Sequence, residues 1–181
     1  MRESLGGPGM VPHIDTSRLS LDRFVMSDAD EVFRCITPAV TRFLAWDPPS
    51  LDVYRSRCQA LCRADDRTEV QFVIRRRDTQ ECLGLVGVER LDDPVPELGV
   101  WMKPTAHGQG FGREAVEAVV RWASGVCEGP GFIYPVAVEN AASRRIAEAL
   151  GGEIIATRSG RKYDSVVYRI PRRLPGVTTP G

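Results

Sequence analysis

The segment His107-Gly108-Gln109-Gly110-Phe111-Gly112 decides which fold the sequence predicts. Its glycines remove Cβ atoms, so a ligand can approach the backbone closely. An amphipathic helical pattern follows at once over residues 111–123, apolar on one face and charged on the other. A helix that starts in such a turn offers free N–H groups and the positive end of its dipole to an anion. We therefore predict a phosphate or pyrophosphate site here; the alternative is a turn that merely starts the helix.

Two familiar phosphate loops do not fit this segment. A Walker A loop requires Gly-Lys-Ser/Thr after four intervening residues, and the chain contains no such run. A dinucleotide-binding loop requires a third glycine where Arg113 stands. That loop also belongs to a parallel βαβ unit near the start of a domain, whereas the residues before His107 predict antiparallel strands.

The upstream elements follow from β-branched and aromatic runs separated by polar turns. Strands are predicted over residues 18–24, 70–74, 82–89 and 98–102. Helices are predicted from residue 27 to about residue 37, where Thr37-Pro38 ends the first, and over residues 51–63. The turn at Arg75-Arg76-Arg77 is expected to be solvated, a basic docking site being the alternative.

Downstream of the amphipathic helix, the pattern returns to strands. It predicts strands over residues 132–138, 154–155 and 165–170, and a short helix that Asn140 caps and Gly151 ends. Together these elements predict an α+β (mixed α/β) fold around a mainly antiparallel sheet. We expect a flexible tail at residues 1–14, one domain over residues 15–172, and a second flexible tail at residues 173–181.

Composition excludes several classes of protein. Lys plus Arg equals Asp plus Glu at 24 each, which argues against a nucleic-acid partner. No apolar run reaches transmembrane length, and residues 1–12 lack a signal-peptide core. Five cysteines at irregular spacing fit reduced thiols and a cytoplasmic location. With only two histidines, no metal site is expected.

The loop and the order of elements resemble the GNAT superfamily of acetyltransferases. That family's pyrophosphate loop reads Arg/Gln-x-x-Gly-x-Gly/Ala, and His107 stands at its first position while Gly110 and Gly112 match the later ones. The resemblance implies a GNAT-like sheet of about six or seven strands flanked by about four helices. It also implies that acetyl-CoA is the co-substrate.

Within the superfamily, the chain resembles most the RimJ/RimL branch, which acetylates the N-termini of ribosomal proteins. The similar segments are Thr16-Ser17-Arg18-Leu19, Phe43-Leu44-Ala45-Trp46, Glu97-Leu98-Gly99-Val100-Trp101-Met102 and Glu139-Asn140-Ala141-Ala142-Ser143. The resemblance covers roughly residues 16–170. Two positions depart from the resemblance. The family usually has Phe where Gly152 stands, and the branch often has a Gly-Leu-containing turn where this chain has Gly129-Pro130-Gly131-Phe132.

The resemblance assigns roles to individual residues. Residues implied to bind the cofactor are Val100, Trp101, Met102, His107, Gly108, Gln109, Gly110, Phe111, Gly112, Arg113 and Asn140. Ser143 is implied to assist departure of the CoA thiolate; an exposed helical serine is the alternative. Tyr134, on a predicted strand, is the second candidate for this role.

The acceptor side is less defined by the sequence. Glu97 is the candidate general base, acting through water, or else a solvated carboxylate at a strand end. Trp46 and Asp47 are candidates for the acceptor pocket, Trp46 alternatively belonging to the core.

The predicted function is an acyltransferase that moves an acetyl group from acetyl-CoA to a primary amine by direct attack on the thioester. The acceptor is a protein N-terminal α-amine or, alternatively, a small amine such as a polyamine, amino acid or antibiotic. A non-catalytic acyl-CoA-binding regulator is the alternative from another class. The sequence leaves open whether longer acyl-CoAs are used and whether the protein forms a homodimer. No membrane partner is expected.

Overall fold

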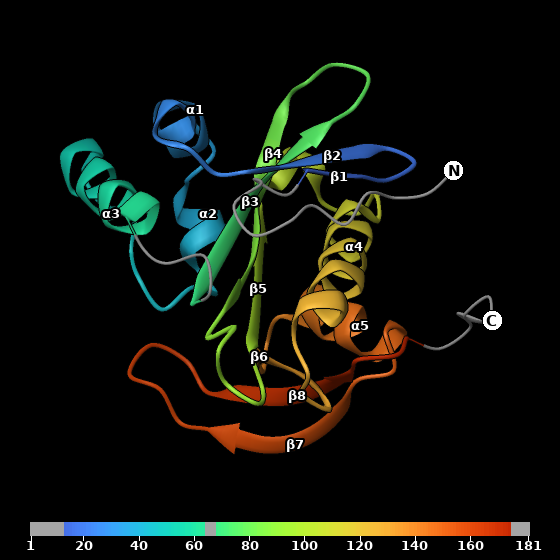
Figure 1. The fold of residues 1–181 in the computed structure, drawn as a ribbon. Helices are drawn as coiled ribbons and strands as arrows, with labels where there is room; N and C mark the ends of the chain where they lie inside the picture. The colour runs from blue at the N-terminus through green and yellow to red at the C-terminus, as the bar shows by residue number, and fades with distance from the viewer. Residues whose placement is uncertain (1–12, 64–67, 175–181) are drawn as a thin grey trace, which may run out of the picture.

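The fold is built on one sheet with the strand order β1-β2-β3-β4-β5-β6-β8-β7. A computed structural model describes residues 13–63 and 68–174 (Figure 1). The strands are β1 (His13–Asp15), β2 (Leu19–Arg23), β3 (Glu69–Arg76), β4 (Cys82–Glu89), β5 (Glu97–Met102), β6 (Gly131–Ala137), β7 (Glu153–Arg158) and β8 (Ser165–Pro171). The helices are α1 (Ala29–Arg34), α2 (Pro38–Thr41), α3 (Leu51–Arg63), α4 (Phe111–Val126) and α5 (Ala141–Ala149).

Helices cover both faces of the sheet, because its strands alternate between two buried clusters. Phe72 and Ile74 of β3 belong to the cluster under α4, while Val73 between them belongs to the cluster under α1 and α3. In Figure 1, α1, α2 and α3 lie on one side of β3 and β4, and α4 lies on the other. Helix α5 contacts α4, β6 and β8.

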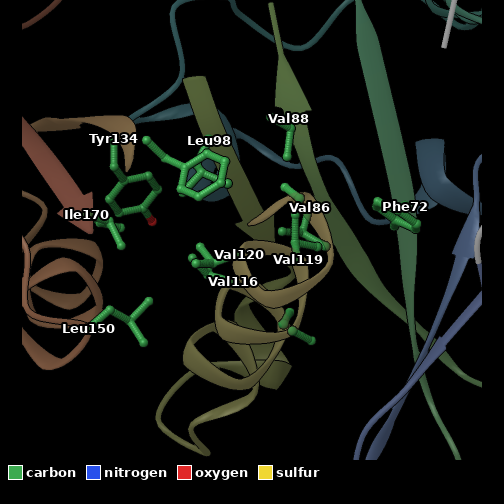
Figure 2. Close-up of a cluster of buried hydrophobic side chains, with 14 of the residues drawn as sticks. Phe72, Val86, Val88, Leu98, Val116, Val119, Val120, Tyr134, Leu150 and Ile170 are labelled. Atoms are coloured by element: carbon green, nitrogen blue, oxygen red, sulfur yellow. The ribbon is translucent and has the colours of Figure 1, made fainter. Parts of the chain in front are cut away.

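Helix α4 forms the centre of the larger cluster. Its buried side chains include Val116, Val119 and Val120, none of which is exposed to solvent. In Figure 2, Val119 lies beside Val86 of β4, and Val116 and Val120 lie below Leu98 of β5. Full burial of such side chains stabilises a fold by about 1.5–3 kcal/mol each. The apolar stripe that predicts this helix therefore also fixes its position over β4 and β5.

The sheet divides where β5 meets β6. Every other neighbouring pair of strands is antiparallel, whereas β5 and β6 are parallel and paired only through Glu97 and Ile133. Beyond that pair the two strands diverge, and each keeps its partner on the far side, β4 for β5 and β8 for β6. A gap with free strand edges therefore opens toward Met102, at the end of β5 that leads to the glycine loop.

The sequence predictions hold for most elements. The α+β class is confirmed, and the bounds of β4 and α3 agree with the prediction. Over the described residues the sheet has eight strands, slightly more than expected, because β1 adds a strand at one edge. The expected tails fall mostly on residues 1–12 and 175–181, which lie outside the described residues, although His13 and Ile14 pair with β2.

Two local predictions are wrong. Pro38 starts a helix instead of ending one: Thr37 is the N-cap of α2 and accepts a hydrogen bond from the Val40 N–H at 3.4 Å. In the turn predicted to be solvated, the Arg76 and Arg77 side chains are 38% and 49% exposed, but Arg75 is only 15% exposed. The Arg75 guanidinium pairs with Asp28 at 3.0 Å and with Glu31 at 2.8 Å. A basic run in a turn predicts exposure only when no acidic helix packs beside it.

Glu114 fastens the β1–β2 turn to the first turn of α4. Its carboxylate accepts hydrogen bonds from the Thr16 hydroxyl at 2.6 Å, the Ser17 hydroxyl at 3.1 Å and the Arg18 backbone N–H at 2.9 Å. The Arg18 guanidinium lies 2.6 Å from the same carboxylate. Burial by itself would raise the pKa of Glu114, but the hydrogen bonds from these three residues outweigh it and hold that pKa below its ordinary value of 4.5.

Glu114→Gln should lower the free energy of unfolding by about 1–2 kcal/mol at pH 7, since charge-assisted hydrogen bonds become neutral ones. Because the folded-state pKa is depressed, this stabilisation is present above pH 4.5 and is lost as pH falls through the folded-state pKa. Urea unfolding at pH 7 and at pH 3.5 should show the difference between wild type and variant shrinking. Glu117→Gln, which breaks only the exposed pair with Arg121, is the matched control and should cost under about 0.5 kcal/mol. Equal losses in both variants would contradict this role for Glu114.

Candidate functional site

The glycine loop has the backbone geometry that the sequence predicts for an anion site. Gly108 and Gly110 both adopt positive φ, at 74° and 80°. Gly110 is the N-cap of the sixteen-residue helix α4 and has no side chain to satisfy the first N–H groups. A Cβ on Gly108 would meet no atom within 4 Å, so the loop surface is open there. The free amides at the start of α4 are thus available to a phosphate.

Residues around the loop hold it in place. The Arg18 side chain donates to the Gln109 carbonyl at 2.8 Å and its guanidinium lies 4.6 Å from the centre of the Phe111 ring. A Cβ on Gly112 would lie 3.3 Å from the Met102 sulfur and 3.2 Å from Ile146 Cδ1. The third glycine therefore allows α4 to pack closely against β5 and α5.

His107 stands beside the loop, with its ring turned to the end of β5. Its Nε2 lies 2.8 Å from the Met102 carbonyl oxygen, and since a carbonyl only accepts, this nitrogen carries the proton. The ring closes the turn between β5 and the loop. This contact is a positioning one, distinct from the pyrophosphate contact that the family pattern implies for this position.

The free edge of β5 is formed by alternate residues. Lys103 N donates to Leu83 of β4, and a Cβ on Gly84 would lie 2.1 Å from the Trp101 carbonyl oxygen, so the odd-numbered positions face β4. Ile133 N of β6 donates to Pro96 on the opposite side. By strand alternation, the backbone groups of Val100 and the N–H of Met102 face the gap. Of the three β5 residues predicted to bind the cofactor, Val100 and Met102 therefore have backbone groups that face the gap. The Trp101 backbone is instead hydrogen-bonded to β4.

On the other side of the gap, α5 presents Ser143. Asn140 is the N-cap of α5 and accepts a hydrogen bond from the Ser143 N–H at 3.1 Å, as the sequence predicts. The Ser143 hydroxyl lies 2.6 Å from the hydroxyl of Tyr134, which is 2% exposed. Tyr134 and Ser143, treated as competing candidates in the sequence, therefore form one hydrogen-bonded pair.

Tyr134 is held in its protonated form. Burial raises the pKa of Tyr134 to about 12, against a smaller lowering by its hydrogen bond with Ser143. Figure 2 shows its ring beside Leu98 and Ile170. At neutral pH its O–H is a donor, and with Tyr134 donating, the Ser143 proton is free to point elsewhere.

Glu97 lies at the closed end of the gap and is engaged by arginines. Its carboxylate is 2.8 Å from Arg90 and 3.7 Å from Arg158. Glu89 stands directly opposite Glu97 in the β4–β5 register. Desolvation, together with the charges of Glu69 and Glu97, raises the pKa of Glu89. The cross-strand register makes Glu89 a second candidate base.

A cleft of about 690 Å³ opens beside the end of β6. Its walls come from α2 and the residues after it, from residues 137–139, and from the β7–β8 loop at residues 162–164. Asp47 lines the cleft and pairs with Lys162 at 2.6 Å. The positive group beside Asp47 is therefore a lysine of this chain and not an acceptor amine. Trp46 contributes its backbone carbonyl to Lys162 at 3.2 Å and is not among the lining residues.

Two negative findings concern the described part of the chain. Residues 13–63 and 68–174 contain no group of three or more His, Cys, Asp or Glu side chains that could hold a metal ion. None of the helices found there is long and apolar enough to cross a membrane.

Comparison with known proteins identifies the family. Residues 18–153 match the family model described as an acetyltransferase (GNAT) domain. The chain belongs to the GNAT acetyltransferase family. It is therefore an acyltransferase. A curated relative, the uncharacterized N-acetyltransferase YoaA of Bacillus subtilis (strain 168), is 26% identical over 172 residues, covering 89% of this chain and 97% of YoaA.

Solved GNAT structures share this fold. An acetyltransferase of the GNAT family from Bacillus anthracis superposes with a TM-score of 0.78 at 16% identity, over 89% of this chain and 99% of that one. RimL, a ribosomal L7/L12 α-N-protein acetyltransferase, superposes with a TM-score of 0.76 at 18% identity, over 91% of this chain and 97% of RimL. The structure of RimL in complex with coenzyme A superposes with a TM-score of 0.76 at 16% identity, over 89% of this chain and 99% of that one.

Three features of this GNAT site were missed from the sequence: the contact between Tyr134 and Ser143, the position of Glu89 opposite Glu97, and the contacts of Lys162. The first two join consecutive elements of the chain, and they depend on how α5 packs on β6 and on the register between β4 and β5. The third joins residues 115 to 121 positions apart. Only the register of the β4–β5 hairpin had a sequence signal, in the turn at Asp92-Asp93-Pro94.

The hydrogen bond between Tyr134 and Ser143 should contribute about 1 kcal/mol of coupling energy to stability. A double-mutant cycle with Tyr134→Phe and Ser143→Ala measures it from urea unfolding of the four proteins. Ser124→Ala removes a hydroxyl bonded to Val120 O elsewhere, and its effect should add to that of Tyr134→Phe. A coupling below about 0.3 kcal/mol for the first pair would mean that the two hydroxyls do not interact.

Proposed function

We propose that this GNAT enzyme transfers an acetyl group from acetyl-CoA to a primary amine. The observation that carries the proposal is the gap between β5 and β6, which opens from the single Glu97–Ile133 pair toward the loop at the start of α4. The pyrophosphate binds the amides of that loop, with Gly108, Gln109, Phe111, Gly112 and Arg113 around it. The pantetheine arm then lies along the free edge of β5 and bonds Val100 and Met102, while Asn140 contacts it from α5.

The reaction is a direct attack on the thioester. The amine nitrogen donates its lone pair to the carbonyl carbon, the C–S bond breaks, and its electron pair leaves with sulfur. Ser143 gives its proton to that thiolate and regains one from water, and the hydrogen bond from Tyr134 supports the serine oxygen in between. The ammonium proton leaves to water or to a carboxylate, for which Glu97 and Glu89 are the candidates. No metal takes part in this scheme.

An α-amine is the acceptor that this scheme suits best. Its reference pKa is about 7.7–8.0, against about 10.4 for lysine, so a sizeable fraction is neutral at pH 7 without a strong base. That matters here, because Glu97 is engaged by Arg90 and Arg158. The likeness to RimL and the resemblance to the RimJ/RimL branch favour a protein N-terminus. We keep the cytoplasm as the proposed location, since all five cysteines are free.

A screen with acetyl-CoA tests the proposed function. Purified protein is offered peptides with free N-termini, the same peptides with blocked N-termini and a lysine, and a panel of polyamines and amino acids, with release of CoA thiol as the readout. Transfer to free N-termini alone supports the proposal. Transfer to polyamines alone would replace the acceptor class, and no transfer to any amine would remove the enzymatic proposal.

Gly110→Asp should weaken acetyl-CoA binding at least about 100-fold, since a carboxylate would face the pyrophosphate in a partly dry site. In Gly110→Asn the new side chain has the same size as aspartate, and asparagine tolerates the left-handed backbone of this residue. Its smaller loss of acetyl-CoA affinity measures the steric effect without the charge. Gly125→Asp places the same charge at a position with no neighbour within 4 Å, near the far end of α4. Calorimetric titration with acetyl-CoA compares the three. Equal affinities for the Gly110→Asp variant and wild type would exclude pyrophosphate binding at this loop.

Ser143→Ala should lower kcat at least about tenfold, because general-acid assistance is worth about 10²–10⁴-fold. Acetyl-CoA affinity should stay within about twofold, since the phosphates and the pantetheine arm keep their partners. Rapid-quench measurement of the chemical step, with an acceptor from the screen, separates the two quantities. Ser124→Ala is the matched control. A kcat within about twofold of wild type would leave Ser143 as a helix residue and make Tyr134 or water the donor.

A further inference from the structure

One lysine bridges two walls of the cleft beside β6. Lys162 lies in the loop between β7 and β8, and its ammonium contacts three oxygens of the segment of residues 41–47: the Thr41 carbonyl at 2.9 Å, the Trp46 carbonyl at 3.2 Å and the Asp47 carboxylate at 2.6 Å. The chain has only two lysines, the other being Lys103. An ammonium has three N–H donors, so the three contacts use all of them.

From these contacts we propose that Lys162 is a positioning residue that ties the segment of residues 41–47 to the β7–β8 loop and so sets the width of this cleft, which we take as the acceptor cleft because the acceptor-pocket candidate Asp47 lines it. Both tied segments line that cleft. Its role toward the acceptor rests on the proposed function, whereas the tie itself does not.

Charge pairing alone does not account for this arrangement. The Asp47 side chain is 84% exposed, and an exposed ion pair contributes little to stability. The exposed pair between Arg42 and Glu139, at 3.4 Å across the same cleft, is of that weaker kind. Lys162 differs because it also bonds two carbonyls, and one of them belongs to Thr41, which is 2% exposed. The tie is therefore anchored in the folded core at the end of α2.

The loop that carries Lys162 is compact. A Cβ on Gly160 would lie 2.5 Å from the Tyr163 carbonyl oxygen, so the chain turns tightly before the lysine. The Asp164 carbonyl accepts a hydrogen bond from Val138 N at 2.9 Å. Val138 immediately follows β6, two residues before Asn140. The β7–β8 loop is thus hydrogen-bonded to a residue that also lines the cleft and lies close to the cap of the helix that carries Ser143.

The geometry distinguishes lysine from arginine. A guanidinium is planar and its donors point outward in a fork, which suits a carboxylate but not three acceptors that converge on one point. Lys162→Arg therefore keeps the charge opposite Asp47 and loses the carbonyl contacts. Lys162→Met keeps the aliphatic stem and loses all three.

Hydrogen–deuterium exchange tests the tie without any substrate. In Lys162→Met, exchange should speed at least about fivefold in peptides covering residues 38–47 and 159–166. Lys162→Arg should not restore the protection. Lys103→Met, which breaks the pair of the other lysine with Glu81 at 2.6 Å, should leave both peptides unchanged. Unchanged exchange in Lys162→Met would overturn the tie, and full protection in Lys162→Arg would reduce it to an ion pair with Asp47.

Kinetics test the consequence for the acceptor. With a peptide acceptor from the screen, Lys162→Met should raise the acceptor KM at least about fivefold and leave the acetyl-CoA KM within about twofold. A kcat loss with an unchanged acceptor KM would overturn the role in cleft width. Faster exchange in an enzyme that acetylates no amine would keep the tie and remove the proposed function, so the two failures are distinguishable.

Discussion

The divergence of β5 from β6 is the constraint on which the rest of the structure depends. Parallel neighbours normally bond along their length, but here one pair at Glu97 and Ile133 joins them. The separation leaves backbone groups of Val100 and Met102 without a strand partner, and such groups require partners when they are covered. An extended ligand with amide groups can supply them. The sheet stays intact because β4 and β8 hold the two strands from outside, and α4 and α5 pack across the division.

Much of this fold could be predicted from local sequence. The bounds of β4 and α3 follow from a change of period and from turn residues, and Asn140 caps α5 as its side chain predicts. The glycine loop could be predicted because positive φ and a close approach to the backbone both require glycine. The start of α2 was missed, since Pro38 is compatible with the end of one helix and with the first turn of the next.

The failures at the site share a physical cause. The direction in which each backbone N–H and C=O of β5 points depends on the register with β4. The sequence alone therefore could not tell that the Trp101 backbone bonds β4 while the Val100 backbone faces the gap. The same holds for Glu89 and Glu97, which lie on consecutive strands and stand opposite each other through the register of β4 with β5. His107 matches a family position that usually holds Arg or Gln, yet its ring bonds the Met102 carbonyl. A motif gives the position of a residue in the chain, whereas its hydrogen-bond partner depends on what folds beside it.

In the proposed function, the cofactor and the acceptor lie against parts of the molecule that are built differently, and this bears on how acceptors are chosen. The cofactor side consists of regular elements, namely β5 and the N-terminus of α4, whose geometry follows from backbone hydrogen bonding and a buried apolar face. The acceptor side consists of a short helix, an irregular segment and a hairpin loop, held together by side-chain contacts such as those of Lys162. Changes in such loops alter a binding wall without disturbing the core. Under this proposal, cofactor binding is tied to the fold itself, while acceptor choice depends on a few side chains that can change independently of it.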